Sequence, residues 1–181
     1  MTTLWLTDEQ AAQIAADARA AAPHEVCGLL AGRDGQVLRV IPVPNTAADR
    51  TRHYVMDATG LSQHLPRLAK DGLELLAFYH SHPKHDPIPS PTDVAQAHYP
   101  ATAQLIVSLK HSAASFGAWQ IAYGAVSPVA LHIRALPPTH VADDPPLSTA
   151  QRSAVLISAL LAFTVLVTAA LALLPPAPPI P

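Results

Sequence analysis

The chain has 181 residues, with 11 Lys and Arg against 13 Asp and Glu, and its formal net charge of −2 gives no basic field that would favour nucleic-acid binding. Its length suits one domain of ordinary size with an appendage, and not two domains. The single cysteine, Cys27, excludes an intramolecular disulfide and any zinc site that needs several thiolates.

Signals for helices and strands alternate along residues 1–136. Thr7 and Gln10 have the spacing of a capping box, so they predict a helix start, and Pro23 ends that helix. A second amphipathic helix is predicted over 58–70, and Asp93 lies in the first turns of a third, over 93–98. Short apolar runs predict strands at 4–6, 26–31, 37–43, 73–79, 104–109, 119–123 and 129–133. This interleaving predicts one compact α/β domain.

The C-terminal part of the chain has a different composition. Ser153–Leu174 is 22 residues without a charge, or about 33 Å as a helix, which matches the hydrocarbon core of a bilayer. A buried core helix is the alternative, but such a helix usually keeps a polar stripe. We therefore expect a tail-anchored, single-pass membrane protein with a proline-rich linker at 137–152 and a proline-rich tail at 175–181. Arg152 before the span favours a cytoplasmic location for the front domain.

The most informative stretch begins at the end of a predicted strand. His80 and His82 are two residues apart, so their side chains point to the same face and can converge on one metal ion. Asp93, across a proline-stiffened loop, can supply a third ligand. Two histidines and one aspartate leave a fourth tetrahedral position for water, whose pKa a zinc ion lowers toward about 7.

Each of these residues also has an explanation without a metal. A His-x-His pair arises readily by chance in a chain with 10 histidines. Ser90 through Asp93 has the pattern of a helix cap, with Ser as N-cap and Asp as its partner. Asp86 is a weaker competing ligand. Glu25 by itself suits a surface carboxylate before a strand, and Cys27 suits a buried small side chain better than a nucleophile.

Together the residues resemble a known family. His80-x-His82, seven residues, Ser90, two residues and Asp93 resemble the JAMM motif of the MPN-plus metallopeptidases. Pro23-His24-Glu25-Val26-Cys27-Gly28 resembles the segment that carries that family's glutamate. The resemblance covers about residues 5–135. It implies a single MPN-like (cytidine-deaminase-like) domain over 1–136, with a mixed β-sheet flanked by helices.

The resemblance also implies roles. His80, His82 and Asp93 would hold Zn²⁺, Glu25 would be the general base, and the Ser90 hydroxyl would donate a hydrogen bond to the oxyanion. The implied activity is hydrolysis, by a zinc-activated water, of a peptide or isopeptide bond at the C-terminal tail of a ubiquitin-like or sulfur-carrier protein.

Two other functions remain open from the sequence. The first is a non-catalytic MPN scaffold that binds protein partners at a membrane, although the complete ligand set argues against it. The second treats His-x-His as part of an amidohydrolase or a deaminase. An amidohydrolase normally needs a longer barrel, and this chain lacks the paired cysteines of a zinc deaminase.

Overall fold

Eight strands and three helices build residues 3–135, the part of the chain that the computed structural model describes. In chain order they are β1 (Thr3–Thr7), α1 (Asp8–Ala21), β2 (Cys27–Arg33), β3 (Gln36–Val43), α2 (Ala58–Lys70), β4 (Glu74–His82), α3 (Pro91–Ala95), β5 (Ala103–Ser108), β6 (Ser115–Ala122), β7 (Ala125–Pro128) and β8 (Ala130–Arg134). The strands form one sheet in the order β7-β6-β5-β4-β2-β3-β1-β8. Strand β1 is parallel to β3 and β8, β4 is parallel to β5, and the other pairs are antiparallel. The predicted α/β domain with a mixed sheet is confirmed.

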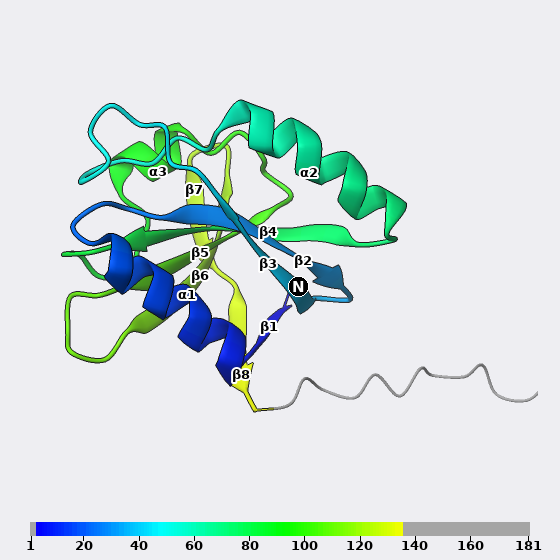
Figure 1. Cartoon of the computed structure of the whole chain (residues 1–181), viewed down its shortest axis with the longest axis horizontal. Helices are drawn as coiled ribbons and strands as arrows, with labels where there is room; N and C mark the ends of the chain where they lie inside the picture. The colour runs from blue at the N-terminus through cyan, green and yellow to red at the C-terminus, as the bar shows by residue number, and fades with distance from the viewer. Residues whose placement is uncertain (1–2, 136–181) are drawn as a thin grey trace, which may run out of the picture. The chain divides into compact units, whose positions relative to one another are not determined.

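Helices α1 and α2 lie on opposite sides of the sheet (Figure 1). On the α1 side, Ile14 and Ala18 of the helix belong to a buried apolar cluster with Leu30 and Tyr79 of the sheet. On the α2 side, a smaller cluster contains Leu29 and Phe78, against which Leu61 and Leu65 of the helix pack. Successive residues of β2 and β4 therefore serve different faces, as the pleat requires.

Local chemistry explains two of the confirmed elements. The capping box at α1 is formed: the Gln10 backbone N–H donates to Thr7 Oγ1 at 3.1 Å, and the Thr7 N–H donates to Gln10 Oε1 at 2.9 Å. Strands β2 and β3, both predicted, form a hairpin closed by Asp34 and Gly35 with φ values of 52° and 79°. Two positive φ angles are typical of the tight turn that Asp-Gly favours.

Several element bounds differ from the prediction, and one strand was missed. Helix α3 covers Pro91–Ala95 and not 93–98, because Ser90 caps it and Pro91 takes its first position. Strand β4 continues to His82, because its pairing with the parallel strand β5 runs to Ser108. Strand β7 was missed, since its four residues are all exposed and carry no apolar alternation.

The predicted linker at 137–152, membrane span at 153–174 and tail at 175–181 lie outside the described residues. Within residues 3–135, no helix has both the length and the apolar character needed to cross a membrane.

Candidate metal centre

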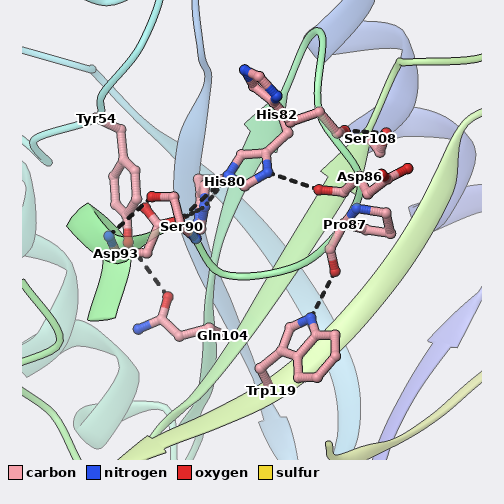
Figure 2. A network of polar contacts seen from close by, with 11 residues as sticks. Tyr54, His80, His82, Asp86, Pro87, Ser90, Asp93, Gln104, Ser108 and Trp119 are labelled. Atoms are coloured by element: carbon pink, nitrogen blue, oxygen red, sulfur yellow. Dashed lines mark hydrogen bonds and ion pairs between the residues drawn. The ribbon is translucent and has the colours of Figure 1, made fainter. Parts of the chain in front are cut away.

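The site lies at the end of β4, a central strand between β2 and β5. His80 is fully buried and His82 is 4% exposed. Their Nε2 atoms are 3.2 Å apart. Asp93, in the first turn of α3, brings Oδ2 to 3.5 Å from His80 Nε2 and to 3.4 Å from His82 Nε2. The structure thus brings the three predicted ligands together, as Figure 2 shows.

The triangle of ligand atoms has the dimensions of one face of a zinc tetrahedron. Ligands at about 2.0–2.1 Å from a tetrahedral ion are separated by about 3.3 Å. The three separations here are 3.2, 3.4 and 3.5 Å. Two imidazole nitrogens and one carboxylate oxygen are also a donor set that zinc accepts. The residues present therefore fit a zinc ion with one coordination position left open.

His82 is oriented by the loop that follows it. Its Nδ1–H donates to the backbone carbonyl of Asp86 at 2.9 Å. A carbonyl can only accept, so Nδ1 carries a proton, and Nε2 is the ring nitrogen that faces His80 and Asp93. Such an outer hydrogen bond sets the tautomer and the ring orientation of a histidine ligand.

The loop between β4 and α3 is held by residues of β5, of β6 and of the turn between them; Figure 2 shows two of these, Ser108 and Trp119. Three side chains reach it: Ser108 Oγ donates to the His85 carbonyl at 2.5 Å, Trp119 Nε1 donates to the Pro87 carbonyl at 2.7 Å, and Lys110 Nζ pairs with Asp86 Oδ2 at 2.7 Å. The Asp86 side chain therefore points to a surface ion pair and not to the triad. Asp86, the weaker metal ligand considered from the sequence, is therefore not part of the ligand triangle.

His80 is positioned by packing. The Tyr54 ring stacks on the His80 imidazole, with centroids 4.3 Å apart and an angle of 20° between the planes. The Tyr54 hydroxyl lies 3.4 Å from Gln104 Oε1, to which it donates. Within the described residues, His80 Nδ1 has no hydrogen-bond partner. Sequence reasoning assigned Tyr54 no role, since a tyrosine in a loop has no spacing that points to the site.

Asp93 and Ser90 form the capping box of α3 as well. The Ser90 N–H donates to Asp93 Oδ2 at 2.6 Å, and the Asp93 N–H donates to Ser90 Oγ at 3.2 Å. Burial would raise the pKa of Asp93, but hydrogen bonds from His80 and His82 outweigh it and hold that pKa well below its usual range. The carboxylate that faces the histidines is therefore ionised, and one oxygen serves both the cap and the ligand triangle.

Glu25 lies beside the triad, just before β2. The β2–β4 register pairs Cys27 with His80, so two residues further along Glu25 stands opposite His82. Two hydrogen bonds of 2.9 Å extend this pairing. The Val26 N–H donates to Ser81 Oγ, and the Ser81 N–H donates to the Val26 carbonyl. Glu25 is 6% exposed, and burial raises its pKa to about 7 although the His82 charge acts in the opposite direction. Glu25, His82 and Ser90 line one cavity of about 440 Å³.

Cys27 is 1% exposed, and its Sγ lies 3.5 Å from the Val43 carbonyl, to which it donates. Burial, together with the charge of Glu25, raises the pKa of the thiol to about 12. Because only a thiolate is a strong nucleophile, Cys27 is a core side chain, as expected from the sequence.

Comparisons with known proteins agree with this geometry. Residues 7–122 match the family of prokaryotic homologs of the JAB domain. The chain is 46% identical over 78 residues to the probable TtuB-protein conjugate cleaving protease of Thermus thermophilus, covering 43% of this chain and 52% of that protein. It is 40% identical over 88 residues to the desampylase of Haloferax volcanii, covering 48% of this chain and 63% of that protein. The matched segments thus span about half to two thirds of these curated relatives.

A solved structure extends the likeness beyond these segments. Protein DSY2949 from Desulfitobacterium hafniense is 31% identical, with a TM-score of 0.68 over 76% of this chain and 97% of that one. The family match, which covers more than half of the chain, and the buried histidine–aspartate triangle lead to the same result. The chain belongs to the prokaryotic homologs of the JAB domain.

Proposed function

We propose that this protein is a zinc metallopeptidase that cleaves the peptide or isopeptide bond after the C-terminal tail of a ubiquitin-like or sulfur-carrier protein. The observation that carries the proposal is the ligand triangle with sides of 3.2–3.5 Å, next to a cavity that Glu25 lines. A scaffold protein has no need of a buried carboxylate facing three convergent metal ligands.

The roles follow from the positions of the side chains. His80, His82 and Asp93 would hold the ion, which when bound supplies Lewis acidity and a water of lowered pKa. Glu25 takes a proton from the attacking water and passes it to the leaving amine, since it lines the same cavity as His82 and has a pKa near neutrality. The Ser90 O–H donates to the oxyanion, because Ser90 Oγ acts only as an acceptor in the helix cap.

The substrate class is supported by the relatives. One is named for cleaving conjugates between TtuB and proteins, and the other is a desampylase. The first name describes a protease that acts on a conjugate, and the share of identical residues is 46% and 40% over the two matched segments. A conjugate of a small carrier protein is accordingly the first substrate to test.

The test is release of the amine partner from a purified carrier-protein conjugate. We expect cleavage at the end of the carrier's C-terminal tail. A chelator should abolish this cleavage, and added zinc should restore it. Glu25→Gln should retain zinc and lose about 10²–10⁴-fold in kcat, because only the proton shuttle is removed. Full activity in that variant would contradict the role of Glu25, and the absence of zinc-dependent cleavage in the wild type would contradict the function.

We also propose that Ser153–Leu174 anchors the protein in a membrane, with the catalytic domain in the cytoplasm. The support is the run of 22 uncharged residues and Arg152 before it. The full chain should remain in the membrane fraction after alkaline washing and need detergent for release, whereas a chain ending at Asp144 should not. A full-length protein that is equally soluble without detergent would refute the anchor.

A further inference from the structure

Two cavities flank the ligand triangle, and they differ in chemistry. Tyr54, which stacks on His80, lines a cavity of about 330 Å³ together with apolar side chains such as Phe78. His82 and Glu25 line a second cavity, of about 440 Å³. If the proposed function holds, Glu25 delivers a proton to the leaving amine. Glu25 lines two cavities, of about 440 and 880 Å³, and of these two only the first is also lined by His82 and Ser90. The cavity of about 440 Å³, called the leaving-amine cavity below, therefore receives the part of the substrate that carries this amine.

The leaving-amine cavity is lined by one cationic side chain that has no ion-pair partner at short distance. Arg52 is the only Lys or Arg that lines it in the described part of the chain. Across residues 3–135, the Arg52 guanidinium takes part in no ion pair within 4.0 Å. Its charge acts on Asp49 from a longer distance and is one of the causes that lower the pKa of that carboxyl, after the hydrogen bonds from Thr51. The other acidic groups nearby are engaged: Asp86 pairs with Lys110, and Asp49 accepts hydrogen bonds from the N–H and hydroxyl of Thr51 at 3.1 and 2.6 Å.

The loop that carries Arg52 is tied to the backbone of the general base. The Glu25 N–H donates to the Arg50 carbonyl at 2.6 Å. Asn45 Nδ2 donates both to the Glu25 carbonyl at 2.8 Å and to the His53 carbonyl at 3.1 Å. Residues on both sides of Arg52 are therefore connected to Glu25. These bonds hold the Arg52 backbone next to Glu25, and the Arg52 side chain lines the leaving-amine cavity.

We propose that Arg52 is a specificity-determining residue that binds a carboxylate attached to the leaving amine. A guanidinium matches a carboxylate with two parallel N–H···O bonds, which makes it a selective partner for that group. The carboxylate has two sources: the α-carboxylate of a single amino acid joined to the carrier tail, or an acidic side chain beside a modified lysine of a protein. Both place a negative charge on the same side of the scissile bond.

Four conjugates of one carrier protein ending in Gly-Gly separate these sources. The first pair joins the tail to alanine or to alaninamide, so that only the α-carboxylate differs. The second pair joins the tail to the lysine of a short peptide whose neighbouring residue is Glu or Gln. With the zinc-loaded full chain, we expect at least about tenfold higher kcat/KM for the charged member of one pair, mainly through a lower KM.

Arg52→Gln should abolish that preference and leave the neutral conjugates unchanged. Arg50→Gln is the matched control, because the Arg50 side chain lines the cavity of about 880 Å³, which Glu25 also lines, and only its carbonyl holds Glu25. A preference lost in Arg50→Gln and kept in Arg52→Gln would place the leaving group in that cavity and overturn the inference. The same preference should appear as an affinity difference when the conjugates bind Glu25→Gln without being cleaved. The pair in which the preference appears identifies the source of the carboxylate.

Two results would overturn the inference, and they are distinguishable. Equal cleavage of charged and neutral conjugates by the wild type, still dependent on zinc and Glu25, would refute Arg52 as a selector while the proposed function stands. A preference that persists in Arg52→Gln would have the same meaning. No zinc-dependent cleavage of any conjugate would refute the proposed function and the inference with it.

Discussion

Strand β4 serves two purposes with its two faces. Ala77 and Tyr79 point into the main apolar cluster under α1. On the other face, His80 and His82 converge with Asp93 at the ligand triangle. The period of two along the strand separates a face that stabilises the fold from a face that can bind a metal. The contrast teaches that substitutions only a few ångströms apart should affect quite different properties.

The largest effect is expected on the ligand face. His82→Ala removes one of three convergent ligands, so zinc content should fall from about one ion per chain to near zero and hydrolysis should fall to background. Zinc analysis after gel filtration and a cleavage assay measure this, and unfolding with chelator present shows whether the fold survives. A variant that keeps its zinc would contradict the assignment of this face of β4 to metal binding. A wild type without zinc would favour the scaffold alternative.

The matching substitution on the apolar face should do the reverse. Leu30→Ala deletes a fully buried side chain of the α1 cluster, and such deletions reduce the free energy of unfolding by about 2–5 kcal/mol. Zinc content per folded molecule should stay the same, because Leu30 does not face the triad. Denaturant unfolding with and without chelator checks both statements. Loss of zinc below the unfolding transition would show that the two faces are coupled.

A smaller effect is expected from the residue that packs on a ligand. Tyr54→Ala removes the ring stacked on His80 and should weaken zinc binding by about 10–100-fold, which is typical of outer partners of a ligand. Tyr54→Phe keeps the ring and loses only a 3.4 Å contact to Gln104, so it should bind zinc almost as well as the wild type. Competition with a chelator of known affinity measures both. Equal loss in the two variants would assign the effect to the hydroxyl.

The smallest effect is a pH dependence from Glu25. Burial raises its pKa from an ordinary 4.5 to about 7, so the carboxyl is protonated, and inactive as a base, below that range. A bound zinc ion favours the carboxylate and moves the midpoint back toward 4.5. We expect kcat/KM to fall about tenfold per pH unit below a midpoint within this interval. Zinc content measured at each pH distinguishes protonation of Glu25 from loss of the metal. A kcat/KM that does not change with pH would contradict Glu25 as the base.

Much of the fold was predictable because its signals are local. The capping box of Thr7 and Gln10, the Asp34-Gly35 turn and the apolar runs act within a few residues, and the structure has each of them. The spacing of His80, His82 and Asp93 likewise follows from one strand and one short loop. Strand β7 was not predictable, since its exposed residues pair only because β6 lies beside them.

The sequence by itself determined the α/β class, the candidate ligands and the family resemblance, because these rest on residue types at short spacings. Only the tertiary structure decided how the ligands are held and what surrounds them. Tyr54 reaches His80 from 26 residues away, and Asn45 joins Glu25 to the loop of Arg52. The Asp86 backbone, and not its side chain, orients His82. Such contacts join residues that are far apart in the sequence and meet only when the chain folds, so the spacing of nearby residues does not predict them.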